Sequence, residues 1–375
     1  MRAERLDTVV IGAGAMGLAA AWQLMRRGVS VTLLERFNIG NVIGASHGAT
    51  RNFNQAYSDP AYLAMLVEAL GLWRELEVES DQTLLDTVGI VNHGASPEFD
   101  QVFTAMTNAG IPAEFLPPVE AARRWPGMRF DTRVLFAPQS GRLRASAVLQ
   151  ALRAVALAGG ADIREGTEVT GIKVIDEDRV QLSTSNGMIM ARRLIVTAGA
   201  WTDQILGGAI ELPRLVITQE QPAHFMRTDD SFEWPSFNHN PTQDDPVYDY
   251  WYSPVYGVFT PGEGVKVGWH GSGPVTDPDA RTFVSDPDQL SALQQYVREW
   301  LPGADPDRFT EISCTYTTTP DSNFVLKHVG PVTVGAGFSG HGFKFTPVVG
   351  RILADLSTEA GDAPALQRPQ WWHTS

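Results

Sequence analysis

A complete dinucleotide-binding fingerprint near the amino terminus constrains this chain more than any other feature. A buried-type strand, 8–11, runs into Gly12-Ala13-Gly14-Ala15-Met16-Gly17, a helix-periodic run then stops at Gly28, and a second strand, 29–34, ends at Glu35. This order predicts a βαβ unit that holds a pyrophosphate at the start of its helix. Glu35 is expected to bind the adenosine ribose hydroxyls, which argues against a 2′-phosphate. The pattern does not distinguish FAD from NAD.

A second glycine-rich segment lies near the carboxyl terminus. The β-branched run 332–334 leads into a loop with glycines at 335, 337, 340 and 342, and an apolar helix-periodic segment follows it. Such a strand, loop and helix start lets backbone N–H groups approach a polar or flat ligand, because glycine has no Cβ in the way. His341 and Lys344 are candidate donors beside that ligand. Alone, the segment is equally typical of a simple turn, and the amino-terminal fingerprint favours the site.

Length, charge and cysteine usage narrow the class of protein. A chain of 375 residues predicts two domains, and 43% apolar with 19% charged residues is typical of a globular protein. A net charge of −14 without a Lys/Arg cluster argues against nucleic acid or a membrane as a partner. No signal-peptide core is visible, so a cytoplasmic location is expected. The single cysteine, Cys314, and eight histidines without ligand spacing predict no disulfide and no metal site.

The remaining chain predicts helices and strands of mixed order. Proline preceded by a capping side chain marks helix starts at Asp59-Pro60, Ser96-Pro97 and Asp286-Pro287, and a further helix spans 145–158. Short strands are predicted at 169–175, 180–184, 188–190 and 194–197. From about 212 to 310, aromatic and proline-rich stretches alternate with strand-like runs, which predicts a long antiparallel sheet that faces a pocket. The rings of 248–252 are either walls of that pocket or core.

Four motifs resemble one family, the FAD-dependent amine oxidases (DAO family) of the monomeric sarcosine oxidase and N-methyltryptophan oxidase type. They are spread over residues 8–355 and comprise 12–17, Ser46-His47-Gly48-Ala49-Thr50-Arg51, Cys314-Thr315-Tyr316-Thr317 with Thr319-Pro320-Asp321, and 337–345. The resemblance implies an α/β (α+β, two-domain) fold, with a Rossmann-like FAD-binding domain and a substrate domain built on a large, mostly antiparallel sheet. The expected FAD-binding domain is discontinuous, 1–85, 145–212 and 311–375, and the substrate domain comprises 86–144 and 213–310.

The resemblance also implies that FAD is bound covalently. In the family a cysteine forms a thioether with the flavin 8-methyl group, and Cys314 stands at that position, although an inert buried cysteine is the ordinary alternative. The residues implied to bind the cofactor are Gly12, Gly14, Gly17, Glu35, Ser46, Thr50, Arg51, Val169, Cys314, Gly340, Gly342 and Lys344.

The same resemblance implies a set of catalytic and substrate-binding residues. Lys266 matches the lysine that lies over the flavin and activates oxygen, whereas a lysine in a strand could instead extend to solvent. The other residues implied to be catalytic are Arg51, His270 and Tyr316. The residues implied to contact the substrate are Asn54, Tyr256, His270, Tyr316 and Lys344, of which Lys344 is implied to bind its carboxylate.

The chain departs from the family pattern at Asn54. The family has a second arginine three residues after Arg51, where it pairs with the lysine on the substrate carboxylate, and this chain has an amide. An amide cannot make the bidentate, charge-assisted contact of a guanidinium. Lys344 therefore binds the carboxylate alone, another group helps it, or the pocket accepts a more polar N-substituent. A sugar-derived amine, such as a fructosyl amino acid, becomes an alternative to sarcosine.

The expected reaction is oxidation of the C–N bond of a secondary amine, an N-methyl or otherwise N-substituted amino acid, to an imine. Dioxygen is expected to be reduced to hydrogen peroxide, so the partners are a small-molecule amine and O2, and the chain is expected to be a monomer or a small homo-oligomer. Three alternatives stay open: an oxidase of fructosyl amino acids (Amadori products), an amine dehydrogenase that uses another electron acceptor, and a flavoprotein that only binds a ligand.

Overall fold

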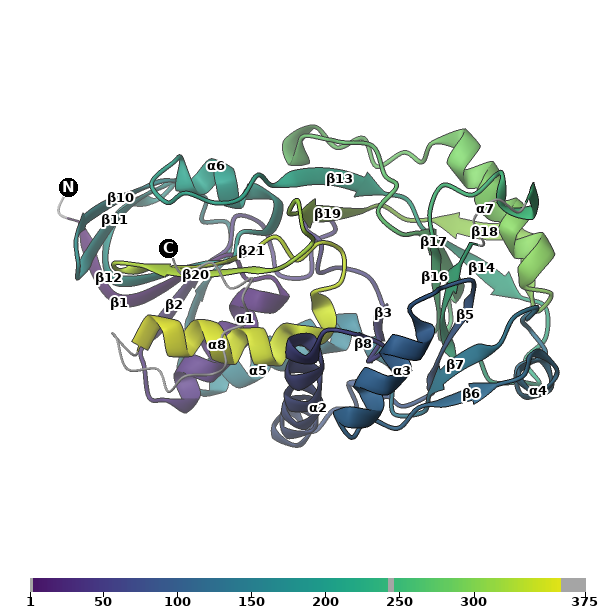
Figure 1. Cartoon of the computed structure of the whole chain (residues 1–375). Coiled ribbons are helices and arrows are strands. Elements are labelled where there is room, and N and C mark those ends of the chain that lie inside the picture. Colours follow the sequence, from purple (N-terminus) through teal and green to yellow (C-terminus); the bar gives the residue numbers. More distant parts are fainter. Residues whose placement is uncertain (1–2, 242–245, 359–375) are drawn as a thin grey trace.

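A computed structural model describes residues 3–241 and 246–358 (Figure 1). The first of its two large sheets has eight strands. At its centre β1 (Glu4–Ile11) pairs in parallel with β2 (Val31–Leu34) on one side and β12 (Gly187–Val196) on the other. The outer strands are β9 (Asp162–Arg164), β10 (Val169–Asp176), β11 (Arg179–Thr184), β20 (Val325–Val329) and β21 (Val332–Ala336). The helix α1 (Ala15–Arg26) joins β1 to β2, so the predicted βαβ unit is confirmed.

Helices cover this sheet because its parallel strands are apolar on both faces. One face packs with the first helix in a core that also contains α2 (Pro60–Ser80), α5 (Ala145–Ala158) and α8 (Thr346–Thr358). Gly350 of α8 lies so close to α1 that a Cβ there would be 2.5 Å from the backbone of Ala19. The opposite face packs against α6 (Thr202–Leu206), which follows the short 3₁₀ turn Gly199–Trp201. Figure 1 shows this layered arrangement.

The second large sheet also has eight strands, in the order β18-β14-β17-β16-β15-β5-β7-β6. Only the pair β15–β5 is parallel, so the prediction of a mostly antiparallel sheet is confirmed. Its strands are β5 (Ile90–Gly94), β6 (Glu114–Leu116), β7 (Val134–Ala137), β14 (Ala223–Arg227), β15 (Ser236–Asn240), β16 (Val255–Thr260), β17 (Gly264–Trp269) and β18 (Ala304–Glu311). The helix α7 (Pro287–Trp300) packs on one face, and α3 (Phe99–Asn108) contacts the other.

Two small sheets lie between the large ones. In one, β8 (Gly141–Arg144) pairs with both β3 (Thr50–Phe53) and β4 (Leu85–Asp86). In the other, β13 (Val216–Glu220) pairs with β19 (Cys314–Thr318) in a ribbon that bridges the two halves in Figure 1. We propose the domain division 1–85, 145–212 and 311–375 against 86–144 and 213–310, because each large sheet draws its strands from one of these sets, apart from Glu311 at the end of β18. Residues 359–375 lie outside the described part.

Several local predictions are confirmed and others are corrected. The carboxylates of Asp59 and Asp286 cap α2 and α7 as predicted. The strands predicted at 188–190 and 194–197 are one strand, β12, because the polar residues between them continue the ladder with β1. The rings of Tyr248 and Trp251 pack in the core under α7, so they are not pocket walls.

The remaining elements are α4 (Pro118–Arg124) and the 3₁₀ turns Pro246–Tyr248, Pro278–Ala280 and Phe343–Phe345, the last of which precedes α8. Among the helices of residues 3–241 and 246–358, none is long and apolar enough to span a membrane.

Candidate active site

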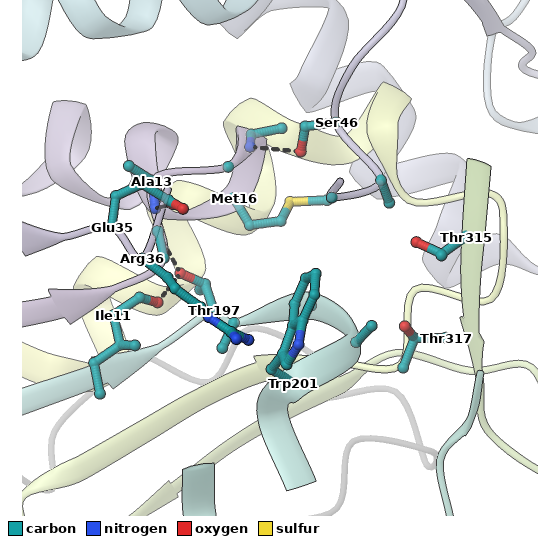
Figure 2. Close-up of a pocket in the computed structure, with 18 of the residues that line it drawn as sticks. Ile11, Ala13, Met16, Glu35, Arg36, Ser46, Thr197, Trp201, Thr315 and Thr317 are labelled. Atoms are coloured by element: carbon teal, nitrogen blue, oxygen red, sulfur yellow. Dashed lines mark hydrogen bonds between the residues drawn. The ribbon is translucent and has the colours of Figure 1, made fainter. Parts of the chain in front are cut away.

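A cavity of about 350 Å³ lies at the start of α1, next to the ends of β1 and β2 (Figure 2). The glycines of the fingerprint make this close packing possible. Gly12 has a φ of +91°, and a Cβ there would lie 2.6 Å from the carbonyl oxygen of Thr197. A Cβ on Gly17 would lie 1.9 Å from the carbonyl oxygen of Gly12. The strand, turn and helix therefore meet without side chains between them, and the helix start is open to a ligand.

Glu35 lies at the end of β2 and lines this cavity, with 8% of its surface exposed. Its carboxylate accepts hydrogen bonds from the backbone N–H groups of Ala13, at 2.8 Å, and Phe37, at 2.9 Å. These two bonds fix the carboxylate beside the glycine turn. A carboxylate has about four acceptor positions, so capacity remains for hydroxyl donors of a ligand.

The opposite side of the cavity is formed by residues from distant parts of the chain. Ser46 Oγ accepts a hydrogen bond from the Ala15 N–H, at 3.0 Å, and so holds the loop after β2 against the helix start. Figure 2 shows Met16, Trp201 and Thr315 around the same space. The first turn of α1 contains no acidic side chain, which leaves its positive dipole end available to an anionic group.

A second cavity, of about 420 Å³, adjoins the first. Both cavities are lined by Arg51, Cys314, Tyr316, Gly340 and Phe343. These shared residues come from the two motifs that the sequence singles out at 46–51 and 314–321 and from the second glycine-rich segment. The tertiary structure thus brings three distant motifs to one junction, beside the sheet that carries Lys266 and His270.

Lys266 projects from β17 into the second cavity and is 3% exposed. Its Nζ donates a hydrogen bond to the backbone carbonyl of Thr50. Burial, and then the nearby Arg51 guanidinium, lower the pKa of Lys266 well below its usual value. The alternative that this side chain extends to solvent is wrong. Thr50 itself lies behind the lysine, with its Oγ1 2.6 Å from Thr260 Oγ1.

The guanidinium of Arg51 is held at the junction by backbone acceptors. It donates to the carbonyl oxygens of Thr50, Ala45 and His47, and it lies 3.9 Å from the sulfur of Cys314. Burial and the Arg51 charge lower the pKa of His47 to about 4, so this imidazole is neutral at pH 7. Because backbone acceptors hold the Arg51 guanidinium in place, the sulfur of Cys314 lies beside a fixed cation at the point where the cavities meet.

His270, Tyr316 and Tyr256 form an aromatic cluster in the second cavity. His270 Nδ1 lies 3.3 Å from the Tyr316 hydroxyl, and the rings of Tyr256 and His270 are 6.3 Å apart. Burial raises the pKa of both phenols and lowers that of the imidazole, so all three groups are uncharged at pH 7. Gly340 has a φ of +76°, and a Cβ there would be 2.2 Å from the Tyr316 ring. That glycine lets the tyrosine lie against the loop.

Lys344 takes part in a directed chain of hydrogen bonds that the sequence does not predict. Its Nζ donates to the Tyr57 hydroxyl at 2.9 Å, and Tyr57 Oη lies 3.0 Å from His341 Nδ1. His341 Nε2 lies 3.0 Å from the Ser322 carbonyl, which can only accept, so Nε2 carries the proton and Nδ1 accepts from Tyr57. Both ring nitrogens of His341 are thus engaged with the protein, and the expectation that it is a donor to a ligand is corrected.

Burial lowers the pKa of Lys344 to about 7. The amine titrates near neutrality, unlike a lysine exposed to solvent. The backbone carbonyl of Lys344 accepts a hydrogen bond from Trp73 Nε1, at 3.0 Å, which anchors the turn Phe343–Phe345 to α2. Tyr57 lies only three residues after Asn54 in the polar segment that follows β3, so proximity to a motif was the only sequence signal for it.

The other predicted residues line one of the two cavities, whereas Gly17 and the buried Thr50 are in the lining of neither. Val169 and Gly342 line the first cavity, together with Gly14. Asn54 lines the second cavity, and its Oδ1 accepts a hydrogen bond from the Ala56 N–H at 2.9 Å. That bond engages the amide oxygen of Asn54 within its own loop.

In the sequence, 197–201 is a short run of small residues and one tryptophan at the end of a predicted strand. The structure places Thr197 and Trp201 in the wall of the first cavity, and the hydroxyl of Thr197 donates to the carbonyl of Ile11 at 3.0 Å. A turn of small residues at the carboxyl end of a parallel strand is a usable signal, because ligands bind at that edge of such sheets.

Comparison with known proteins agrees with this geometry. The family model described as FAD dependent oxidoreductase matches residues 7–356. Monomeric sarcosine oxidase from Bacillus sp. (strain NS-129) is 32% identical over 366 residues, which cover 94% of this chain and 92% of the relative. N-methyl-L-tryptophan oxidase from Yersinia pestis (strain Pestoides F) is 26% identical, with coverages of 93% and 94%. The structure of NikD, an amino acid oxidase of nikkomycin biosynthesis, superposes with a TM-score of 0.85 at 29% identity, covering 96% of this chain and 95% of NikD.

Proposed function

The chain belongs to the FAD dependent oxidoreductase family, and from that premise we propose that it oxidises the C–N bond of a secondary amine, an N-methyl or otherwise N-substituted amino acid, to an imine. One observation carries the proposal: a single cavity joins the flavin-motif residues Arg51 and Cys314 to two buried lysines and to the uncharged pair His270 and Tyr316. That set can bind a carboxylate, accept a proton and stabilise developing negative charge in one place.

The residues present fit FAD. The turn 12–17 leaves backbone N–H groups at the start of α1 for a pyrophosphate, and Glu35 retains acceptor capacity for the ribose hydroxyls. Gly340 and Gly342 line the junction, where their missing Cβ atoms let the Tyr316 and Phe338 rings pack against the loop, and a flat ring would lie against this backbone. When bound, FAD accepts a hydride equivalent from the carbon next to the amine nitrogen and transfers the electrons to an acceptor.

The protein's own groups bind and orient the amine. In its protonated form, Lys344 binds the substrate carboxylate, and its hydrogen bond to Tyr57 holds the ammonium in place. Neutral His270, paired with Tyr316, can accept a hydrogen bond or a proton from the amine nitrogen. The imine product reacts with water to give an amine and a carbonyl compound.

Lys266 is proposed to serve the reaction with oxygen. Reduction of O2 to hydrogen peroxide takes up two electrons and two protons and develops negative charge on the oxygen. Lys266 is buried, and its hydrogen bond to the Thr50 carbonyl fixes the position of its amine. A donor that is fixed in a site without water stabilises developing negative charge most strongly. Because burial lowers the pKa of Lys266, an anion forming next to it favours the protonated amine and draws a proton to the site.

Covalent attachment of FAD through Cys314 is part of the proposal. Its support is the position of the sulfur at the junction of the two cavities, beside the Arg51 guanidinium. We further propose O2 as the acceptor, a cytoplasmic location, and a monomer or small homo-oligomer, in line with the sequence-based expectations.

Anaerobic mixing with a panel of secondary amines tests the proposal. A substrate should bleach the flavin in the absence of oxygen, and admission of air should restore the colour with one hydrogen peroxide per amine. Bleaching followed by slow recovery in air identifies a dehydrogenase with another acceptor. No bleaching by any N-substituted amino acid or sugar-derived amine would contradict the proposal.

A further inference from the structure

One row of side chains crosses the face of the second large sheet that forms the floor of the second cavity. In register, Asn92 of β5 lies beside Asn238 of β15, Asn238 beside Tyr256 of β16, and Tyr256 beside Gly268 of β17. Residues paired in this way project to the same face. Val91, one position before Asn92, points to the opposite face and packs in the core under α7. The two asparagines therefore belong to the cavity side.

The row runs from Gly268 of β17, next to His270, to Asn92 of β5. A Cβ on Gly268 would lie 2.8 Å from the Tyr256 hydroxyl, so the absence of a side chain at 268 lets the phenol extend across β17. On that side it approaches His270. On the other side, neighbouring strands are about 4.8 Å apart, so Asn238 lies one strand and Asn92 two strands beyond Tyr256. The amides thus extend the floor away from the His270 and Tyr316 pair.

The two amides are linked to each other, and Asn92 Nδ2 also donates to the Leu135 carbonyl at 3.5 Å, so the open position of the pair is on Asn238. Asn238 Nδ2 donates to Asn92 Oδ1 at 2.8 Å, and both residues line the second cavity. Within residues 3–241 and 246–358, Asn238 Oδ1 has no protein donor. Asn54 lines the same cavity; the bond from the Ala56 N–H holds its Oδ1, and in the described part of the chain no protein acceptor takes its Nδ2. A ligand that reaches this region meets acceptors on the floor and donors on the wall.

The cationic charges of the cavity do not come from this region, and the carboxylate in its lining, Glu98, lies exposed at the start of α3. The cationic side chains, Arg51, Lys266 and Lys344, come from the motif strand β3, from β17 and from the second glycine-rich segment. The floor beyond Tyr256 contributes neutral amides instead. A cavity of about 420 Å³ is also within the range of about 300–1,000 Å³ typical of sites for drug-sized ligands.

We propose that Asn92, Asn238 and Asn54 recognise an uncharged hydroxyl- or carboxamide-bearing group on the substrate, beyond the reacting C–N bond. This inference rests on the proposed amine oxidation and names its substrate class. Hydroxyls and carboxamides can both donate and accept, which matches the acceptor Asn238 Oδ1 and the donor Asn54 Nδ2. An apolar group in the same place offers no partner to Asn238 Oδ1 or to Asn54 Nδ2, which disfavours it.

Matched substrate pairs provide the test. N-hydroxyethylglycine and N-propylglycine have the same shape, as do N-carbamoylmethylglycine and N-isobutylglycine, and a polyhydroxylated N-substituent extends the reach. In the wild type the polar member of at least one pair should have the higher kcat/KM, by about fivefold or more for one hydrogen bond. In Asn238→Ala that ratio should fall to about one. Asn108→Ala, at the exposed end of α3, is the matched control and should retain the wild-type ratio.

A binding measurement separates recognition from turnover. Thioether acids in which sulfur replaces the amine nitrogen are not oxidised as amines, and their Kd follows from the change in the flavin spectrum. The hydroxyethyl thioether acid should bind to the wild type more tightly than the propyl thioether acid does. In Asn54→Ala and in Asn238→Ala, the two acids should have equal Kd values. Equal Kd values in the wild type, or a preference that survives both variants, would overturn the inference. If no amine bleaches the flavin but this preference holds, the proposed reaction fails and the recognition stands.

Discussion

The Nζ atom of Lys266 donates a hydrogen bond to the backbone carbonyl of Thr50, which joins residues 216 positions apart. Lys266 lies on the large antiparallel sheet, and Thr50 begins the strand that carries Arg51. A second contact, between the hydroxyls of Thr50 and Thr260, ties the same two regions together. The buried amine is therefore positioned by both halves of the molecule, and its place beside the flavin motifs does not depend on solvent.

Replacing Lys266 by methionine should separate the two half-reactions. The side chain keeps much of its volume but loses the amine, so reoxidation of the reduced enzyme by O2 should slow by about 10²-fold or more, whereas reduction by the amine changes far less. Stopped-flow measurement of each half-reaction checks this. Lys173→Met, on the exposed part of β10, is the control. Equal losses in both half-reactions would assign Lys266 a structural role.

Wild-type protein should remain yellow after acid precipitation, because a thioether to Cys314 survives denaturation. Cys314→Ala should release free FAD into the supernatant under the same conditions. Absorbance of the pellet and supernatant, with the mass of the intact protein, decides the matter. A colourless wild-type pellet would mean that FAD is bound without a covalent link.

Binding of a carboxylate ligand without an amino group should depend on pH through Lys344. Its pKa is about 7, so the amine is charged below that pH and neutral above it, while the ligand stays anionic throughout. Affinity should be constant below pH 7 and fall as the pH rises beyond it, which spectral titration of the flavin measures.

Two tyrosine variants test whether the hydrogen bond from Lys344 to Tyr57 sets the pH at which affinity begins to fall. Tyr57→Phe removes the oxygen that accepts from the ammonium, which should move the break to lower pH. Tyr62→Phe is the matched control, because its hydroxyl donates to Asn323. A break that stays in place in Tyr57→Phe would show that the chain of hydrogen bonds does not tune Lys344.

Asn54→Arg should move the substrate preference toward small N-methyl amino acids. A guanidinium here can share the carboxylate with Lys344 and adds a charged contact of about 1.5–3 kcal/mol. The same change replaces the small amide of the polar end by a longer side chain whose donors are engaged with the carboxylate, so larger or hydroxylated amines should lose kcat/KM relative to sarcosine. A ranking that is unchanged, with sarcosine already best in the wild type, would show that Asn54 does not determine specificity.

The features that the sequence determined by itself are those with local causes. The fingerprint 12–17 and Glu35 could be identified because a tight turn, a helix start and a strand end are set by neighbouring residues. The caps Asp59 and Asp286 were predictable for the same reason, since each carboxylate binds N–H groups two or three residues away. Alternation of aromatic, turn and strand residues likewise indicated the antiparallel sheet.

Other features were decided only by tertiary structure, because they depend on pairing between distant segments. The burial of Lys266, the core position of Tyr248 and the bond from Lys344 to Tyr57 each follow from elements that meet only after folding. The Asn92–Asn238 pair spans 146 residues and arises from the one parallel contact of its sheet. Residue type shows that a side chain can bind; which side chains share a cavity is set by strand order and register, which no local pattern encodes.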